Sequence, residues 1–424
     1  MPAAAGRPGL VRYVGLFSGL SGYETEAHIV VDYLRRAGYN LVVVPVGGAA
    51  RRAASPRFTG PSVHPPVGPS VEVLHLPPQL LEASSDAARR RSAAAGTGGR
   101  HPRVGRTMTE TAVLPRSWAR ACRSLDEIWV PSRFNLTAFA RAGLPEERLR
   151  VVPVGVDTAL FRPRRADGDA VAPPSGEGSG ESASGGHGRA APRGGGAEEG
   201  VLPWRPGDAD SSRFKFLSVF AWQARKGWDI LLRAYLREFT AADGVLLVLK
   251  TRPFGLSEKE QRRQLARVVA EETGYRRPGT APPVRLLTAR LTAPEMARLY
   301  SACDAFVLPS RGEGFGRPYL EAMASGLPTI GTGWGGNLDF MTHENSYLIE
   351  VEGFEPAAGD PVARLYEGEY WARPSLEDLR RLMRRVVERP GEAAERGRKA
   401  REDSAGWSVA ATCGRLAREL DRFL

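Results

Sequence analysis

The chain has 424 residues, of which 42% are hydrophobic, and a formal net charge of +11. This length suffices for two domains of ordinary size, whereas no stretch approaches the ~18 uncharged apolar residues of a membrane-spanning helix. The positive charge is almost all arginine and is spread along the chain without an interleaved aromatic motif, which argues against nucleic-acid binding and favours attraction to anionic sugar nucleotides or lipid headgroups.

The first part of the chain reads as a strand, a glycine-containing loop, a helix and a second strand, over residues 11–17, 18–23, 24–37 and 40–46. This order predicts a βαβ unit. The loop contains Gly19 and Gly22 but does not read G-x-G-x-x-G, so it gives only a weak dinucleotide-binding fingerprint.

A further strand is predicted at Val71–Leu76, and His75 lies at its carboxyl end, where ligands collect in open α/β sheets. Two interpretations of His75 stay open here, a site residue or an ordinary histidine at the end of a strand. Strands are also predicted at 126–130 and 149–154, and Ser132 is suited to cap a helix that ends at Ala142.

Residues 164–212 consist mainly of Gly, Ala, Ser, Pro and Glu, so this segment has little to bury and is predicted to be a disordered insertion at a domain boundary. Beyond it the alternation resumes, with strands at 214–220, 245–250, 284–288 and 303–308 and helices at 226–239, 257–272 and 293–301. Such alternation predicts a parallel sheet covered on both faces. We therefore expect two facing doubly wound domains, 1–163 and 213–405, followed by a terminal helix within 406–424.

The most informative stretch is Phe306–Phe340, in which a short apolar strand leads through a loop with Gly312, Gly314 and Gly316 into a helix. Pro318 suits the first turn of that helix, where its missing N–H removes no hydrogen bond. Loop glycines let the backbone approach a ligand closely, and free N–H groups at a helix N-terminus attract phosphate. The stretch therefore predicts a phosphate site.

Two carboxylates bracket this element, Glu313 in the loop and Glu321 near the end of the first helical turn. Carboxylates accept hydrogen bonds from paired sugar hydroxyls, although a random pair of glutamates would be read as solvated surface acids. Here the run resembles the E-x7-E signature of retaining GT-B glycosyltransferases of family 4, the glycosyl transferases group 1. The resemblance extends over the strand Gly-Leu-Pro-Thr-Ile and the turn at Gly335–Asp339 that follow it.

This resemblance implies the GT-B fold, with two facing Rossmann-like domains and a C-terminal helix that crosses back to the first domain after Trp407. It also implies transfer of a hexose, with retention of configuration, from a nucleoside diphosphate sugar to a hydroxyl acceptor, without a cofactor or an essential metal. The catalytic residues implied are Glu313, Lys226 and His75. The donor-binding residues implied are Glu321, Arg225, Lys250, Gly314, Phe315, Gly316, Arg317, Gly335, Gly336, Asn337, Gly19 and Gly22.

Within this set, Glu313 is expected to bind hexose hydroxyls and Glu321 the ribose. Lys226 follows a predicted strand and starts a helix in a chain with few lysines, which favours a specific role for this ammonium at the diphosphate. The family usually has an arginine where Ala221 stands, and Arg225 or Arg317 would have to supply the missing charge. Asp339 occupies a position where many relatives have glutamate.

The three cysteines are far apart and lack the spacing of a metal or redox site. With no basic segment followed by a long apolar one at the start, we expect no signal peptide and a cytoplasmic protein, with peripheral contact to an anionic membrane as a further option. The expected partners are a sugar-nucleotide donor and a glycan, lipid or protein hydroxyl acceptor. Two other functions stay open: a non-catalytic binder of sugar nucleotides or anionic surfaces, and a GT-B phosphorylase or epimerase.

Overall fold

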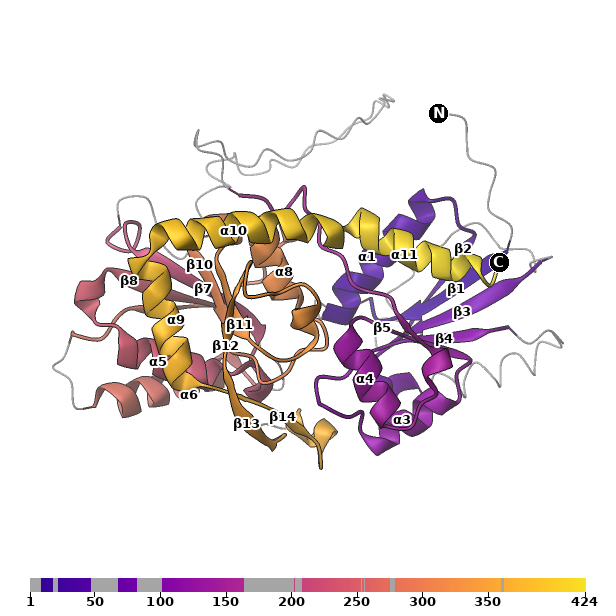
Figure 1. Cartoon of the computed structure of the whole chain (residues 1–424), viewed down its shortest axis with the longest axis horizontal. Helices are drawn as coiled ribbons and strands as arrows, with labels where there is room; N and C mark the ends of the chain where they lie inside the picture. The colour runs from indigo at the N-terminus through magenta and orange to yellow at the C-terminus, as the bar shows by residue number, and fades with distance from the viewer. Residues whose placement is uncertain are drawn as a thin grey trace, which may run out of the picture.

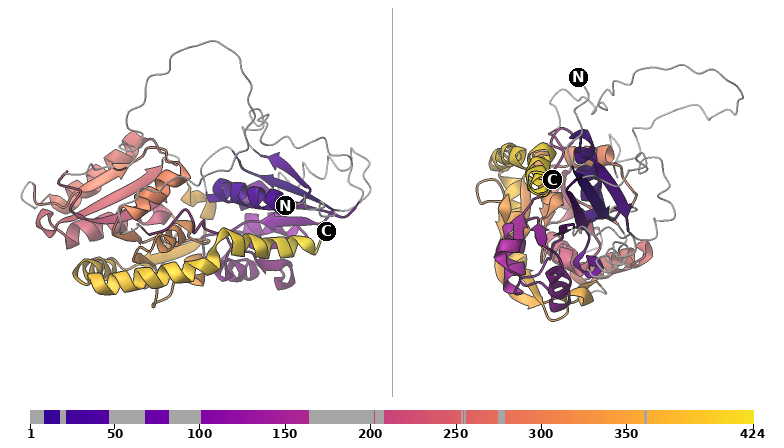
Figure 2. Two further views of the ribbon diagram at one scale, coloured as in Figure 1. Left: turned by 90° about the horizontal axis from the view of Figure 1, so that it is seen from above. Right: turned by 90° about the vertical axis from the view of Figure 1, so that its right-hand side faces the viewer.

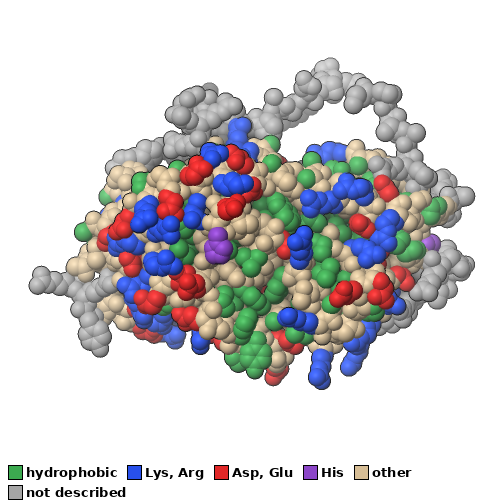
Figure 3. Space-filling model, in the orientation of Figure 1, with side chains coloured by type: hydrophobic (Ala, Val, Ile, Leu, Met, Phe, Trp, Pro, Cys, Tyr) green, Lys and Arg blue, Asp and Glu red, His purple; other side chains and the backbone are tan. Residues whose placement is uncertain are grey.

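The computed structural model describes residues 9–17, 22–46, 68–81, 101–163, 202, 208–252, 254, 256–274, 279–359 and 362–424. Gly19 and nearly all of the predicted insertion at 164–212 lie outside these residues. The described chain forms two α/β lobes placed side by side (Figure 1). Basic and acidic side chains are interspersed over much of the face shown in Figure 3, as expected from a charge spread along the sequence.

The first lobe is built on a six-stranded parallel sheet with strand order β2-β1-β3-β4-β5-β6. Its strands are β1 (Leu10–Gly15), β2 (Leu41–Pro45), β3 (Ser70–His75), β4 (Arg103–Arg106), β5 (Glu127–Val130) and β6 (Leu149–Val151). Its helices are α1 (Gly22–Arg36), α3 (Arg116–Arg123), α4 (Arg133–Arg141) and the short η2 (Glu146–Arg148). Apolar residues of α1, among them Val30 and Leu34, pack on β1 and bury one face of this sheet.

The second lobe contains another six-stranded parallel sheet, with order β12-β11-β10-β7-β8-β9. Its strands are β7 (Phe214–Ala221), β8 (Val245–Arg252), β9 (Val284–Leu287), β10 (Ala305–Leu308), β11 (Thr329–Thr332) and β12 (Tyr347–Ile349). Its helical segments are η3 (Ala224–Lys226), α5 (Trp228–Glu238), η4 (Ala241–Asp243), α6 (Glu258–Thr273), α7 (Ala293–Ser301), α8 (Arg317–Ala324), η5 (Gly336–Asp339) and α9 (Leu376–Glu388). The central strands β7, β8 and β10 are buried in one core, as strands covered by helices on both faces must be.

An antiparallel hairpin, β13 (Val351–Pro356) with β14 (Tyr370–Pro374), leaves the second sheet, and η6 (Ala363–Tyr366) lies between its strands. The chain then runs through α10 (Pro390–Ser404) and η7 (Ala405–Trp407) into α11 (Val409–Asp421). Figures 1 and 2 show α10 lying along the second lobe and α11 along the first. Leu416 and Leu420 of α11 enter the core of the first lobe, while Trp407 contacts Phe315 and Phe340 of the second.

The predicted fold class, two doubly wound parallel-sheet domains with a terminal helix that crosses back, is therefore confirmed. Strand β4, which contains Gly105 and Arg106, was not predicted from the sequence. That strand is short and mostly polar or glycine, so it carries no apolar pattern. The hairpin β13–β14 and helices α3 and α10 were also not predicted.

Helix α5 begins two residues later than predicted because Gly227 adopts a left-handed conformation, with φ of 61°, between η3 and α5. A Cβ at this position would lie 1.9 Å from the Pro309 carbonyl oxygen, so only glycine fits. Among the described residues, the helices are all too short or too polar to cross a bilayer.

Close packing of α10 against the second lobe gives a matched test of the fold. A Cβ on Gly397 would lie 2.3 Å from the Gly326 carbonyl oxygen, whereas a Cβ on Gly391, in the same helix, meets nothing within 4 Å. We expect Gly397→Ala to lower the free energy of unfolding by about 1–3 kcal/mol through overpacking. Gly391→Ala should raise it by about 0.5–1 kcal/mol through helix propensity. Urea unfolding checks both values, and equal effects of the two substitutions would contradict the packing.

Candidate active site

A buried lysine and a buried glutamate form the centre of the candidate site. The Lys226 Nζ atom lies 2.5 Å from Glu313 Oε1, and both side chains are almost completely buried. Lys226 ends η3, which directly follows β7, and Glu313 lies in the loop after β10. Because β7 and β10 are paired neighbours in a parallel sheet, their carboxyl ends bring the two residues to the same edge.

Glu313 has further donors around it. The Ser310 hydroxyl donates to Glu313 Oε1 at 2.7 Å, and the Arg225 guanidinium lies 3.4 Å from Glu313 Oε2. Burial alone would raise the pKa of the Glu313 carboxyl, but Lys226 and Arg225 together hold it below its usual value. Burial, assisted by the neighbouring Arg225, lowers the pKa of Lys226. Glu313 is therefore a carboxylate held ionised by cations.

Arg225 extends the site to the first lobe. Its guanidinium donates to the Gly312 carbonyl at 2.5 Å and lies 3.2 Å from the Glu110 carboxylate, which belongs to the loop after β4. The Tyr366 hydroxyl, from η6 of the second lobe, also donates to Glu110. One carboxylate of the first lobe is thus held by two side chains of the second.

The glycine loop before α8 also contacts the first lobe. The Gly314 carbonyl accepts hydrogen bonds from the Ser132 hydroxyl at 2.7 Å and from the Asn135 amide at 2.8 Å, and both donors lie at the start of α4. A Cβ on Gly336 would lie 2.0 Å from that same carbonyl oxygen. Gly316 precedes α8 with φ of 94°, a left-handed conformation that glycine adopts without steric cost.

The second predicted glutamate, Glu321, lies on the buried side of α8. It accepts hydrogen bonds from the Tyr300 hydroxyl at 3.0 Å and from the Arg317 guanidinium at 2.7 Å. Arg317, predicted to bind phosphate, is therefore paired with the carboxylate one turn away. The predicted donor residue Phe315 points its side chain into the aromatic core with Phe340 and Trp407, so only its backbone can serve a ligand.

Asn337 and Lys250 border the same edge of the second sheet. The Asn337 amide nitrogen donates to the Thr332 carbonyl at 3.0 Å, whereas its Oδ1 atom has no hydrogen-bond partner among the described residues although it is buried. An unpaired buried acceptor is costly, which makes Oδ1 a natural acceptor for a ligand hydroxyl. Lys250 lies near the carboxyl end of β8, where burial and the nearby Arg252 lower its pKa to about 8.

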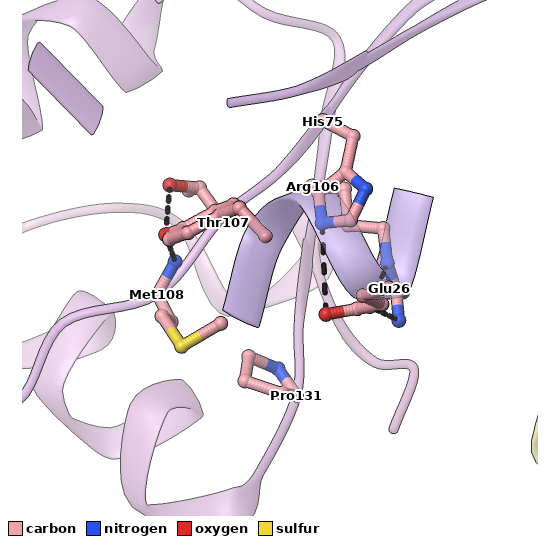
Figure 4. A pocket seen from close by; sticks show the side chains of 7 residues that line it. Glu26, His75, Arg106, Thr107, Met108 and Pro131 are labelled. Atoms are coloured by element: carbon pink, nitrogen blue, oxygen red, sulfur yellow. Dashed lines mark hydrogen bonds and ion pairs between the residues drawn. The ribbon is translucent and has the colours of Figure 1, made fainter. Parts of the chain in front are cut away.

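His75 lines a small cavity of the first lobe, together with Tyr23, Glu26 and Arg106, rather than lying beside Glu313 (Figure 4). Its Nδ1 atom is 2.6 Å from the Tyr13 hydroxyl, and its Nε2 atom is 3.6 Å from the Glu26 carboxylate. Glu26 forms an ion pair with Arg106, and burial lowers the pKa of His75. Met108, which lines this cavity, also packs against Gly314 in the loop of Glu313.

The structure thus brings together Lys226, Arg225 and Glu313 and places the predicted glycines and Asn337 around them. It does not bring His75 into direct contact with this group, and Gly22, which is exposed at the start of α1, has no contact there that the structure records. Glu110 and Tyr366 were missed because their relation to Arg225 depends on how the lobes meet. Glu26 could have been found, since a carboxylate on the apolar face of a predicted helix requires a buried partner.

Residues 212–367 match the family model of the glycosyl transferases group 1. Over 171 residues, 40% of this chain, the sequence is 30% identical to the serotype-specific mannosyltransferase WbdA of Escherichia coli. Over 87 residues, 20% of this chain, it is 36% identical to a GDP-mannose-dependent alpha-mannosyltransferase of Mycolicibacterium smegmatis. The matched segments span 17% and 23% of these relatives, so less than a quarter of their length.

Solved structures resemble the chain over nearly its whole length. Anabaena HepE in complex with UDP-glucose superposes with a TM-score of 0.65 at 16% identity and covers 97% of this chain and 99% of that one. Sucrose-phosphate synthase from Thermosynechococcus elongatus gives a TM-score of 0.61 at 16% identity and covers 98% and 100%. At this identity the likeness establishes the fold, which is that of GT-B glycosyltransferases.

The ion pair of Glu26 and Arg106 predicts a specific acid dependence of stability. Burial would raise the pKa of Glu26, but Arg106 and His75 lower it to about 2, below its value of 4.5 in an unfolded chain. The folded-state pKa is depressed, so this stabilisation is complete above pH 4.5 and is lost as the pH falls toward 2. The free energy of unfolding should fall by about 3 kcal/mol over this range, because the pKa of Glu26 is about 2 in the folded chain and 4.5 in the unfolded one.

Glu26→Gln should remove that dependence and should lower stability at pH 7 by about 3–5 kcal/mol, because Arg106 then stays buried without a counter-charge. Urea unfolding between pH 7 and pH 3 measures both effects, with the exposed Glu344→Gln as control. An acid profile of Glu26→Gln identical to that of the control would contradict the assignment.

Proposed function

We propose that this chain, whose second domain belongs to the glycosyl transferases group 1 family, transfers a hexose from a nucleoside diphosphate sugar to a hydroxyl acceptor with retention of configuration. The observation that carries the proposal is the buried group of Lys226, Arg225 and Glu313 beside the N-terminus of α8. Two cations and a helix N-terminus suit a diphosphate, and a carboxylate held ionised suits sugar hydroxyls.

In this mechanism the donor diphosphate lies at the start of α8, with Lys226 and Arg225 against its phosphates. Negative charge grows on the diphosphate as the glycosidic bond breaks, and the Lys226 ammonium stabilises that charge. Glu313 orients the hexose through its hydroxyls, and Glu321 binds the ribose. The leaving phosphate oxygen accepts the proton of the acceptor hydroxyl, which attacks from the same face of the sugar. These side chains take the place of a divalent cation, so a chelator should leave turnover unchanged.

We propose GDP-mannose as the first donor to test. The relatives named above are mannosyltransferases, and one is named as GDP-mannose-dependent. UDP-glucose is the second, because the structural neighbour HepE binds it. The acceptor is a hydroxyl of a glycan, a lipid or a protein.

A non-catalytic sugar-nucleotide binder is a second candidate. It is favoured by Ala221, which stands where the family usually has an arginine and so leaves one cation fewer at the diphosphate. Calorimetry that finds donor binding, together with no hydrolysis and no transfer across a panel of acceptors, would support this candidate against the enzyme.

Lys226→Ala and Glu313→Ala should each lower kcat/KM by a factor of about 100 or more, the usual loss when one stabilising group is removed from a transition state. The exposed Lys259→Ala on α6 is the matched control and should retain full activity. Because each substitution leaves a buried charge unpaired, a thermal unfolding curve of each variant, and of the isosteric Glu313→Gln, separates loss of chemistry from loss of fold. Full turnover in both alanine variants would end the assignment.

Because the pKa of Lys250 is lowered, we expect donor binding to depend on pH. With a pKa of about 8, its ammonium is charged at pH 7 and mostly neutral at pH 9. If the charged form contacts the diphosphate, affinity for GDP or UDP should fall by about tenfold between these values, since one pH unit above the pKa leaves about a tenth of the groups charged. Lys250→Arg stays charged and should bind with less pH dependence. Calorimetric titration of both proteins with GDP or UDP at pH 7 and pH 9 measures this difference. The same pH dependence of affinity in wild type and Lys250→Arg would exclude Lys250 from the phosphate site.

A further inference from the structure

The loop that carries Glu313 also contains Arg311, whose side chain is 12% exposed and contacts three other segments. Its guanidinium binds both oxygens of the Asp229 carboxylate, with Nη1 2.8 Å from Oδ1 and Nη2 2.9 Å from Oδ2. Nη1 also donates to the Ala224 carbonyl at 2.7 Å, and Nε lies 2.5 Å from the Glu355 carboxylate. One side chain therefore joins the loop of Glu313 to η3, to the first turn of α5 and to the hairpin strand β13.

The backbone around Arg311 makes further hydrogen bonds between the same segments. The Arg311 N–H donates to the Arg225 carbonyl at 2.7 Å, and the Ser310 hydroxyl donates to that carbonyl at 3.1 Å. The Ala372 N–H of β14 donates to the Arg311 carbonyl at 2.9 Å. Because the Arg225 carbonyl belongs to the peptide bond before Lys226, the backbone that carries this lysine is fixed against the loop that carries its carboxylate partner.

The contact between Arg311 and Asp229 requires an arginine. A guanidinium presents its N–H donors in a rigid plane, so it can hold a carboxylate with two parallel hydrogen bonds and still donate to a carbonyl, whereas a lysine is a flexible point charge. Burial alone would raise the pKa of Asp229, but the hydrogen bonds and the charge of Arg311 hold it below its usual value. The pair is therefore ionised at neutral pH, and its hydrogen bonds are of the strong, charge-assisted kind.

We propose that Arg311 is a positioning residue, which holds the Lys226 ammonium at the Glu313 carboxylate by fixing η3 against the loop after β10. A lysine side chain is flexible, so the place of its ammonium depends on where its backbone is held. Arg311 itself binds no part of the donor and acts only through Lys226 and Glu313. The consequence for catalysis rests on the proposed function, whereas the effect of Arg311 on the position of Lys226 does not.

The hairpin β13–β14 takes part in this arrangement through Glu355 and Ala372. The same hairpin reaches the first lobe, because η6 places the Tyr366 ring 5.1 Å from the Trp118 ring of α3 and the Tyr366 hydroxyl against Glu110. The contact of the hairpin with the first lobe and the position of the lysine thus share one guanidinium. Glu355→Gln, which weakens only the contact with the hairpin, should therefore have a smaller effect than substitution of the arginine itself.

Reaction of the lysines with an acylating reagent tests the proposal in the full chain, without a donor or an acceptor. Peptide mass spectrometry gives a separate rate for each lysine. In wild-type protein the buried Lys226 should react at least about tenfold more slowly than the exposed Lys259, because burial protects an amine from the reagent. Arg311→Gln should raise the rate at Lys226 by about tenfold, since η3 then opens locally. Lys215, which is buried at the opposite edge of the same sheet, should keep its wild-type rate.

Three further substitutions show whether the effect belongs to this contact. Arg373→Gln removes an exposed arginine of β14 that lies 3.8 Å from Glu352, and it should leave the rate at every lysine unchanged. Asp229→Asn should have the same effect as Arg311→Gln, and the double variant should exceed neither by more than about twofold, because the two side chains act as one unit. Arg311→Lys should restore little, since a lysine cannot bind the carboxylate at both oxygens.

Kinetics with a donor and an acceptor that the wild type accepts then measure the catalytic consequence. Arg311→Gln should lower kcat by about tenfold to a hundredfold and change the KM for the donor by less, because the charge that Lys226 stabilises appears only as the glycosidic bond breaks. A substitution that merely destabilised the fold would instead lower the unfolding temperature and leave kcat per folded molecule unchanged.

Slow labelling of Lys226 in Arg311→Gln, as in wild type, would overturn the proposal. Equal acceleration at Lys226 and Lys215 would overturn it as well, because it would indicate a general loosening of the fold. Faster labelling of Lys226 alone supports it. If the wild type transfers no sugar while this labelling result holds, the function proposed above fails and the positioning role of Arg311 remains. Faster labelling with an unchanged kcat would remove Lys226 from the chemistry and again leave the positioning role.

Discussion

The ion pair of Lys226 and Glu313 constrains the rest of the site. Two opposite charges buried at 2.5 Å remain ionised only where further polar groups surround them, since isolated charges in a protein interior are far too costly. Ser310 and Arg225 provide those groups on the glutamate side. Arg225 in turn requires Glu110, and with it the first lobe enters the site. The position of one lysine thus determines which residues of both lobes must meet.

The glycines follow from the same constraint. For the Glu313 loop to lie under the first lobe, its backbone must come within hydrogen-bond distance of Ser132 and Asn135, and a side chain at Gly312 or Gly314 would collide with Glu110 or Met108. At these glycines the two lobes pack so closely that no side chain larger than hydrogen fits between them. That accounts for the glycine-rich spacing without any reference to a bound ligand.

The sequence was sufficient for the features that depend on local pattern. Alternating apolar runs gave both sheets, and the spacing of Glu313, the loop glycines and Pro318 gave the strand, loop and helix of the site. It was insufficient where a residue's role depends on contacts between distant parts of the chain. Glu110 and Tyr366 meet Arg225 across the junction of the lobes, and His75 is engaged by Tyr13 and Glu26 inside the first lobe. Nothing in the neighbouring sequence of Glu110, Tyr366 or His75 records these partners. Strand β4 was missed for a related reason, because only its pairing with β3 and β5 makes it a strand.

The contact between Glu110 and Arg225 also bears on how the proposed site would take a donor. A diphosphate at the start of α8 and the Glu110 carboxylate compete for the same guanidinium, and a cation that pairs with one is less available to the other. If the donor binds as proposed, it would exchange the contact between Glu110 and Arg225 for a contact between Arg225 and the ligand. The affinity for the donor and the arrangement of the lobes would then be thermodynamically coupled. Tyr366, which donates to Glu110 from the second lobe, would keep part of the contact between the lobes once Arg225 pairs with a phosphate. On this proposal the donor weakens the contact between the lobes and does not abolish it.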